Sequence, residues 1–217
     1  MIKNEELTGK LRCVLKDAQI VATSIPLTPE IQLYLMSEKY PRRPITDDER
    51  SFLMDEPPYW AFCWSSGQVL AEWIWKFPEV VYGKRVLDFG SGSGVTAIAA
   101  ALCGAREVVA LDSDILAIEA ILANAELNRV SLKIARDLSA VRGHFDVVLA
   151  ADILYDKNNF PLLDTFIDLA YRVIVADSRV KDLSEPYKKI GSGVAITCPD
   201  LDEPEEFKNV AVFAYPS

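Results

Sequence analysis

Short apolar segments alternate with longer helical ones through the second half of the chain. The apolar runs are rich in Val, Ile, Leu and Phe and do not alternate with polar residues, which is typical of strands buried on both faces. Strands that alternate with helical segments predict βαβ units and a parallel sheet. The expected strands are 84–89, 107–111, 132–135, 145–150, 172–176, 193–197 and 210–215, and the expected helices are 95–103, 114–128 and 158–170.

The two ends of the chain have a different pattern. No helical pattern separates the last two expected strands, so we expect them to pair as an antiparallel hairpin. Residues before 83 mix helical and loop patterns around a proline-rich, acidic middle. We therefore expect one compact α/β domain, in which a small helical and loop extension over 1–82 covers the cofactor and substrate. A Rossmann-like core over 83–217 is expected to carry a seven-stranded, mostly parallel sheet, which binds ligands at the carboxyl ends of its strands.

A glycine-rich turn follows the first expected strand of this core and opens a helix. Gly90, Gly92 and Gly94 let the backbone turn tightly and let a ligand approach it closely. A dinucleotide-binding turn would have its third glycine where this chain has Val95, so the spacing disfavours NAD. Asp88 precedes the turn and would repel a pyrophosphate, but it would attract a ligand with a cationic end. S-adenosylmethionine, with its ammonium and sulfonium groups, is such a ligand.

Two further acids follow the next expected strands. Asp112 ends the second strand, where a carboxylate accepts hydrogen bonds from both ribose hydroxyls of a nucleotide. Asp137 follows the weak third strand and is expected to accept from the adenine amino group. Each acid alone also fits a helix N-cap, which is the role expected of Asp114. The neighbouring residues that complete this side of the expected cofactor site are Ser91, Ser113 and Leu138.

The composition disfavours several classes of partner and cofactor. The 217 residues include 23 Lys and Arg against 32 Asp and Glu, a net charge of −9, which disfavours a surface for nucleic acid. His144 is the single histidine, so neither a zinc site of several histidines nor any other metal is expected. The N-terminus has no targeting pattern, and no apolar run reaches the roughly 18 residues of a membrane span. We expect a cytoplasmic monomer that binds neither nucleic acid nor membrane.

The glycine turn and its acids resemble those of the seven-β-strand, S-adenosylmethionine-dependent (class I) methyltransferases. The end of the fourth core strand, Asp152-Ile-Leu-Tyr155, is similar to the D-x-x-Y signature of one group of protein lysine methyltransferases. Further segments that resemble motifs of this group are 27–31, 58–68, 80–84 and 124–128. Together they make the chain similar to the electron transfer flavoprotein beta-subunit lysine methyltransferases. The loop 176–179 departs from the family pattern, because its Asp and Arg remain but a Pro-Gly pair is missing.

The resemblance implies a protein substrate that carries the target lysine, S-adenosylmethionine as cofactor and S-adenosylhomocysteine as product. Methyl transfer needs a neutral amine aligned opposite the departing sulfur, so the protein contributes mainly by positioning. Asp152 is expected to orient the incoming ammonium and pass its proton toward solvent. Tyr155 is expected to form part of an aromatic wall, where burial lowers the pKa of an amine, or to hydrogen-bond the amine. Trp60 and Trp64, on one face if their segment is helical, and Ala151 are expected beside the cofactor.

Other functions remain open at this point. A small-molecule amine N-methyltransferase would have the same glycine turn, because the turn contacts only the cofactor. A different protein substrate, such as a ribosomal protein, would also fit. A catalytically silent binding module is a third possibility, against which Asp152 and Tyr155 argue. On spacing alone, Asp152 also fits a helix cap and Tyr155 a packing residue, and without the resemblance the default role of the two tryptophans is that of core aromatics.

Overall fold

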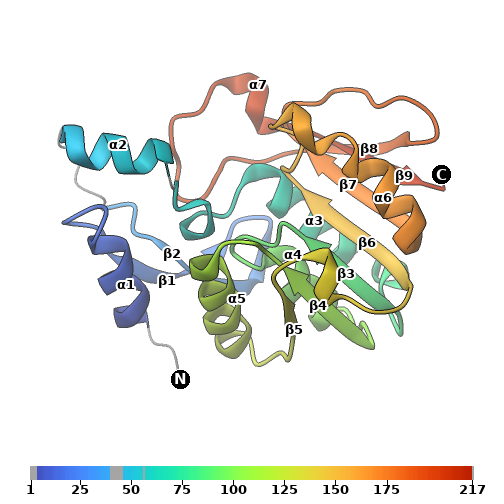
Figure 1. Cartoon of the computed structure of the whole chain (residues 1–217), viewed down its shortest axis with the longest axis horizontal. Coiled ribbons are helices and arrows are strands. Elements are labelled where there is room, and N and C mark those ends of the chain that lie inside the picture. Colours follow the sequence, from blue (N-terminus) through green and yellow to red (C-terminus); the bar gives the residue numbers. More distant parts are fainter. Residues whose placement is uncertain (1–3, 40–45, 56, 217) are drawn as a thin grey trace.

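A seven-stranded sheet organises the chain in the computed structural model, which describes residues 4–39, 46–55 and 57–216 (Figure 1). Its strands are β3 (Arg85–Phe89), β4 (Glu107–Leu111), β5 (Lys133–Ala135), β6 (Phe145–Ala151), β7 (Ala170–Asp177), β8 (Lys188–Val194) and β9 (Asn209–Tyr215). They are ordered β5-β4-β3-β6-β7-β9-β8, and only β9 runs antiparallel to its neighbours. The predicted mostly parallel sheet with an antiparallel C-terminal pair is therefore confirmed.

Helices cover both faces of this sheet. They are α3 (Ser65–Lys76), α4 (Val95–Leu102), α5 (Ile115–Leu127), α6 (Leu162–Leu169) and the short α7 (Glu205–Lys208). Strand β7 shows why the strands are apolar throughout: Ile174 and Ala176 pack with α3 and α4, whereas Val173 and Val175 pack with α6. Helix α3, which the sequence assigns to the extension, packs directly on β7 and β9. Within the described residues, no helix has the length and apolar character needed to cross a bilayer.

The N-terminal segment contains a β-hairpin, and the expectation of helix and loop alone is wrong. Helix α1 (Asn4–Arg12) precedes strands β1 (Ile20–Ile25) and β2 (Thr28–Met36), which pair antiparallel, and α2 (Asp47–Asp55) follows them. Alternate residues of β2, among them Ile31, Leu33 and Leu35, are fully buried against the core of the sheet. This alternation is the ordinary pattern of a half-buried strand and was readable in the sequence.

Two asparagines hold the hairpin to the rest of the chain: Asn124 in α5 and Asn128, the C-cap of that helix. The buried Asn124 accepts a hydrogen bond from the Tyr34 amide (2.6 Å) and donates one to the Ser93 carbonyl in the glycine turn (2.8 Å). Asn128 accepts from the Gln32 amide at 3.0 Å and donates to the carbonyl of the same residue. The segment 124–128 therefore joins β2 to the glycine turn.

Two predicted elements are misplaced. Strand β8 lies at Lys188–Val194 and not at 193–197, because a glycine-containing segment pairs with β9. A Cβ on Gly191 would lie 2.5 Å from the Trp73 ring of α3, so only glycine fits where this helix crosses the strand. The helix expected over 158–170 is a short 3-10 turn at Lys157–Asn159 followed by α6, which begins after Pro161.

Candidate functional site

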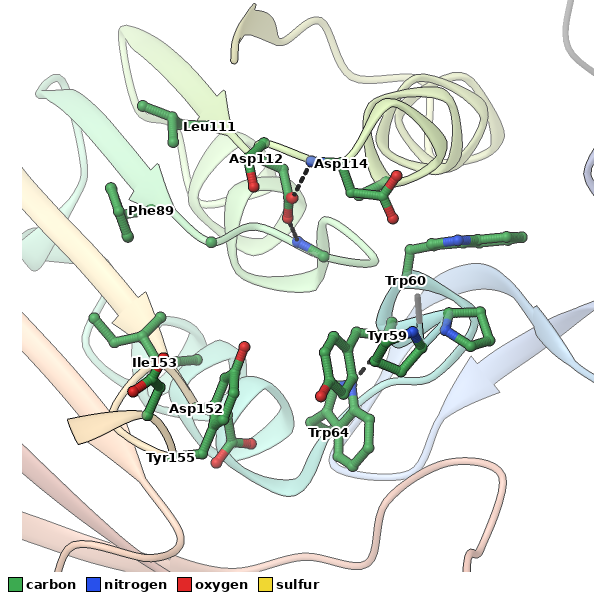
Figure 2. A pocket seen from close by; sticks show the side chains of 18 of the residues that line it. Tyr59, Trp60, Trp64, Phe89, Leu111, Asp112, Asp114, Asp152, Ile153 and Tyr155 are labelled. Atoms are coloured by element: carbon green, nitrogen blue, oxygen red, sulfur yellow. Dashed lines mark hydrogen bonds between the residues drawn. The ribbon is translucent and has the colours of Figure 1, made fainter. Parts of the chain in front are cut away.

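A cavity of about 1300 Å³ opens at the carboxyl ends of β3, β4 and β6. Its walls come from the glycine turn, from the ends of these strands, from α1 and from the 3-10 turn η1 (Tyr59–Ala61). Figure 2 shows Asp112 and Asp114 above this space, and Asp152, Tyr155, Tyr59 and Trp64 below it. This is the edge of a parallel sheet at which ligands bind.

The glycine turn adopts backbone conformations that glycine supplies without strain. Gly90, Gly92 and Gly94 have φ of +66°, +55° and +84°. Gly90 and Gly92 line the cavity, and a Cβ on Gly92 would meet nothing closer than the Gly90 carbonyl oxygen at 4.0 Å. Gly94 is the N-cap of α4 and packs on Ile121 away from the cavity lining. The turn therefore leaves open space directly above its backbone.

Asp88 lies behind the turn and is not among the residues that line the cavity. It is 2 % exposed, and its carboxylate accepts hydrogen bonds from the Ser91 hydroxyl (2.5 Å) and the Ala97 amide (3.1 Å). Burial raises the pKa of this carboxyl to about 7. The direct ligand contact expected of Asp88, and of Ser91 beside it, is not what this geometry provides. Both residues instead hold the turn on the first residues of α4.

Asp112 faces the cavity from the end of β4. One carboxylate oxygen accepts from the Gly92 amide at 2.8 Å, and the other accepts from the Asp114 amide at 3.0 Å. Burial raises its pKa. Ser113 lines the cavity beside it, and Asp114 is the N-cap of α5 as predicted, accepting from the Leu116 amide at 2.8 Å.

Asp137 lies on the exposed rim of the same cavity. It caps the 3-10 turn Leu138–Ala140 by accepting from the Ala140 amide at 3.1 Å. Its pKa is lowered, first by the hydrogen bond from the Ser139 hydroxyl. Leu138 lines the cavity next to it.

Three aromatic rings form a wall across the cavity from Asp112 and Asp114. The Tyr59 ring centroid is 5.7 Å from that of Trp64 and 5.8 Å from that of Tyr155, and the Trp64 Nε1–H donates to the Tyr59 carbonyl at 3.0 Å. Tyr155 is 53 % exposed, and partial burial raises its pKa. Trp60 is buried, lines the cavity, and its Nε1 has no hydrogen-bond partner among the described residues. Trp60 and Trp64 do not share a helix, because Trp60 lies in η1 and Trp64 is the N-cap of α3.

The end of β6 brings Ala151 and Asp152 to the cavity. The Asp152 backbone has a φ of +52°, in the left-handed region that Gly, Asn and Asp enter more readily than other residues. Its carboxylate accepts from the hydroxyl of Ser66 at 2.6 Å and from the hydroxyl of Ser178 at 2.9 Å. No helix begins at Asp152, because the next turn, Lys157–Asn159, has Asp156 as its N-cap.

Sequence reasoning missed three of these residues. Tyr59 lies inside the aromatic segment that carries the resemblance, so its neighbours were a signal for it. Ser66 and Ser178 reach Asp152 across 86 and 26 residues of chain, and a serine hydroxyl leaves no pattern that one sequence can reveal. Lys10 and Leu11 of α1, and Val14 just after it, also line the cavity and were not predicted.

Known proteins resemble this chain in sequence and in fold. The sequence profile of the ribosomal protein L11 methyltransferase (PrmA) family matches residues 72–180. The electron transfer flavoprotein beta subunit lysine methyltransferase of Homo sapiens is 35 % identical over 179 residues, which cover 79 % of this chain and 67 % of that protein. The crystal structure of ribosomal protein L11 methylase from Lactobacillus delbrueckii subsp. bulgaricus has a TM-score of 0.54 at 20 % identity and covers 88 % of this chain and 96 % of its own.

Magnesium protoporphyrin IX methyltransferase of Synechocystis PCC 6803 was crystallised with bound S-adenosylmethionine. Its structure has a TM-score of 0.53 at 16 % identity and covers 81 % of this chain and 86 % of its own. The likeness to the two solved structures shows that the fold is shared.

Proposed function

Since the chain belongs to the family of electron transfer flavoprotein beta subunit lysine methyltransferases, we propose that it methylates a lysine side chain on that flavoprotein subunit. The methyl donor in this proposal is S-adenosylmethionine, and the product is S-adenosylhomocysteine. The observation that carries the proposal is the meeting of Asp152 with Tyr155 and Tyr59 at the edge of one cavity, opposite the glycine turn.

The described residues fit S-adenosylmethionine in three ways. The open space above Gly92 would be filled by a Cβ, so the bare backbone suits close approach of the ligand. Trp60 has a buried indole N–H without a partner at the cavity wall, and a ligand acceptor would satisfy it. Asp112 faces the cavity from the end of β4, where a carboxylate suits ribose hydroxyls.

From this fit we propose a cofactor site on the glycine-turn side of the cavity. Asp112 and Ser113 would hold the ribose, and Asp137 and Leu138 the adenine. Gly90, Gly92, Ala151 and the two tryptophans would enclose the remainder, with Asp88, Ser91 and Gly94 shaping the turn from behind. We also propose that residues 1–82 cover the site and that 83–217 form the catalytic core; the presence of α1 in the cavity wall supports this division.

Bound S-adenosylmethionine supplies the methyl group: a bond forms from the lysine nitrogen to the methyl carbon as the carbon–sulfur bond breaks, and the amine's proton goes to solvent. Asp152 would accept a hydrogen bond from the incoming ammonium and orient it along the line of attack. Tyr59 and Tyr155 would enclose the amine in aromatic surroundings, which lower its pKa and favour the neutral, nucleophilic form.

The proposal is tested by incubating the protein with methyl-labelled S-adenosylmethionine and the purified flavoprotein beta subunit. We expect label on a lysine of that subunit. Label on another protein of a cell lysate would show a different protein substrate, and label only in the small-molecule fraction would show an amine N-methyltransferase. Cofactor binding without any transfer would show a silent module.

Three expectations from the sequence stay predictions. The monomeric state is tested by light scattering, the cytoplasmic location by cell fractionation, and the lack of nucleic-acid affinity by a filter-binding assay.

A further inference from the structure

The Asp152 carboxylate lies between two serines from elements far apart in the sequence. Ser66, the second residue of α3, donates to it twice, from its amide to Oδ2 (3.2 Å) and from its hydroxyl to Oδ1 (2.6 Å). Ser178, directly after β7, donates from its hydroxyl to Oδ1 at 2.9 Å, and its amide is 3.4 Å from the same oxygen. Both serines are buried, so they hold the carboxylate in one orientation.

The backbone of Asp152 is held in a conformation that favours this arrangement. A non-glycine residue in the left-handed region costs about 1–3 kcal/mol and persists only where the surroundings enforce it. The Asp152 amide donates to the Ala176 carbonyl at 3.0 Å, which keeps the residue beside the end of β7. The carboxylate thereby meets the first turn of α3, where the helix dipole favours an anion.

A count of acceptor positions shows what the carboxylate has left to offer. An ionised carboxylate has about four lone-pair positions, two on each oxygen. Both hydroxyls occupy Oδ1, whereas Oδ2 receives only the Ser66 amide among the described residues. One acceptor position on Oδ2 is therefore free, on a residue that lines the cavity.

We infer that Ser66 and Ser178 are positioning residues for methyl transfer, because they fix the Asp152 carboxylate so that its free acceptor position on Oδ2 receives the substrate amine. This inference rests on the proposed function. Ser178 lines the cavity and Ser66 does not; in this inference both serines act through Asp152.

The test compares Ser66→Ala and Ser178→Ala with Ser37→Ala, a buried serine of the N-terminal segment that does not line the cavity. We expect each of the first two changes to lower kcat about 10- to 100-fold, because a small misplacement of an orienting group is costly. The KM for S-adenosylmethionine should stay near that of the parent protein, and the melting temperature should fall only slightly, because each change removes one hydrogen bond to a carboxylate. Ser178→Thr, which keeps a hydroxyl, should retain more of the rate than Ser178→Ala. Ser37→Ala should leave kcat unchanged.

A second comparison uses Asp152→Asn as the background. If the serines act through the carboxylate, adding Ser178→Ala to Asp152→Asn should lower kcat by less than about threefold further, because coupled residues are not additive. Multiplication of the two separate losses would overturn the inference. So would a fall in melting temperature and in cofactor affinity that accounts for the whole loss of rate, because that is the result of a purely structural tie. If Ser66→Ala does not fold, Ser178→Ala carries the test alone.

The outcome separates this inference from the proposed function. If the parent protein labels a lysate protein other than the flavoprotein subunit, the proposed substrate is wrong, and the same rate ratios are read on the labelled protein. Equal rates for the parent and both serine variants on any acceptor overturn the inference alone. No labelled protein in either acceptor overturns both.

Discussion

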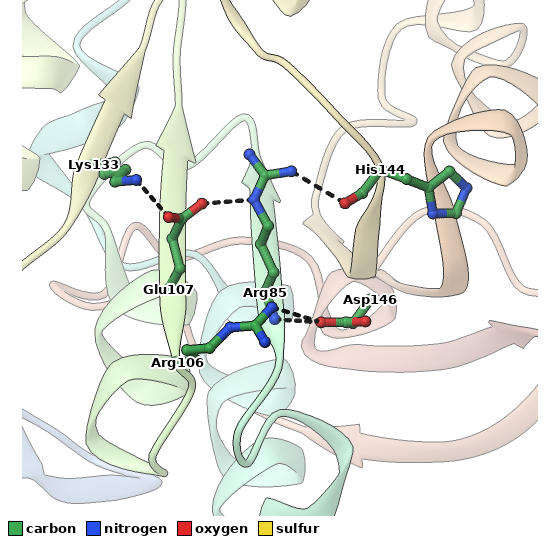
Figure 3. A network of polar contacts seen from close by, with 6 residues as sticks. All are labelled: Arg85, Arg106, Glu107, Lys133, His144 and Asp146. Carbon is green, nitrogen blue, oxygen red and sulfur yellow. Dashed lines mark hydrogen bonds and ion pairs between the residues drawn. The ribbon is translucent and has the colours of Figure 1, made fainter.

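The acidic residues at the two ends of the central strands have different kinds of partners. At the amino ends of β3 and β4, Glu107 accepts from the Arg85 guanidinium at 2.6 Å and also pairs with Lys133. Asp146, near the start of β6, accepts from the Arg85 amide at 2.7 Å and lies 3.7 Å from Arg106 (Figure 3). Each of these carboxylates is neutralised by cations of the chain itself.

At the carboxyl ends of the same strands the carboxylates have only neutral donors. Asp112 accepts from backbone amides, and Asp152 from the amides and hydroxyls of two serines. Asp177, at the end of β7, accepts from three backbone amides, and burial raises its pKa. In the part of the chain that the structure describes, no Lys or Arg nitrogen lies within ion-pair distance of these acids.

The difference shows that the acids behind the net charge of −9 are not equivalent: those at the amino ends of the strands are paired with Arg or Lys, and those at the carboxyl ends are not. Amide and hydroxyl donors orient the carboxylates at the carboxyl ends of the strands without cancelling their charge, so these carboxylates still attract a cationic ligand. S-adenosylmethionine and a lysine ammonium are both cations. The single histidine lies at the other end, where the rings of His144 and Tyr171 are 4.3 Å apart, and it does not line the cavity.

The largest expected effect comes from removing the acid at the cavity end of β6. Asp152→Ala should lower the rate of transfer about 1000-fold, because positioned acid–base and orienting groups contribute on this scale. The affinity for S-adenosylmethionine, measured by calorimetry, should change little. Asp146→Ala, at the opposite end of the same strand, is the matched control and should retain the rate. Collapse of cofactor binding in the first variant would show that Asp152 serves the cofactor instead.

The next largest expected effect is on the pH dependence of the free energy of unfolding, through the buried carboxyl of Asp88. Its folded pKa of about 7 lies above the ordinary 3.8, so the folded protein keeps a proton that the unfolded chain loses near pH 4. The native state then binds more protons between about pH 4 and 7, and its free energy of unfolding falls as the pH rises through that window. Relative to Asp88→Asn, the loss should approach about 4 kcal/mol above pH 7. Urea unfolding of both proteins measures it, and parallel pH profiles would contradict the buried, protonated carboxyl.

A moderate effect is expected at Asp112. Asp112→Ala should weaken S-adenosylmethionine binding about 10- to 100-fold, because hydrogen bonds to a charged group are worth about 1.5–3 kcal/mol. Asp112→Asn retains an acceptor for the Gly92 amide and should lose less. Equilibrium dialysis with labelled cofactor separates the two. An unchanged affinity in Asp112→Ala would refute the ribose assignment.

The smallest effect belongs to the paired acids. Glu107→Gln should cost about 1 kcal/mol of stability, because partly exposed ion pairs contribute little. The difference from the parent protein in urea unfolding should shrink in 1 M NaCl, which screens such pairs. Methyl transfer should stay at the parent rate. If Glu107→Gln lost as much rate as Asp152→Ala, the proposed difference between the acids at the amino ends and those at the carboxyl ends of the strands would be wrong.

Features set by neighbouring residues were predictable from the sequence. The glycine turn, the N-cap at Asp114 and six of the seven strand positions depend on local backbone preferences and on apolar runs, which one sequence displays. Strand β8 was misplaced because its glycines make room for Trp73 and Val69 of α3, and that requirement exists only in three dimensions.

The candidate site was likewise predictable only where local sequence patterns mark its residues. Asp112 was singled out because ligands bind at the carboxyl ends of parallel strands. Asp152 and Tyr155 were singled out through the resemblance to the D-x-x-Y group, and both line the cavity. The placement of Asp88 behind the turn was not foreseen, because a carboxylate that holds a loop and one that holds a ligand look alike in sequence. The contacts of Ser66 and Ser178 with Asp152 depend on how α3 and β7 meet β6, which no local pattern records.

Asn124 has a consequence for how such a protein can be recombined. Its amide joins β2 to the glycine turn, so an N-terminal hairpin taken from another protein would meet the same side chain. A donor hairpin that offered no backbone N–H at the position of Tyr34 would leave the buried Asn124 Oδ1 without this partner, on the same side-chain amide whose nitrogen donates to the Ser93 carbonyl. In a chimera with an exchanged N-terminal segment, we therefore expect the glycine turn to stay ordered only if the new hairpin keeps its contact with Asn124 of α5.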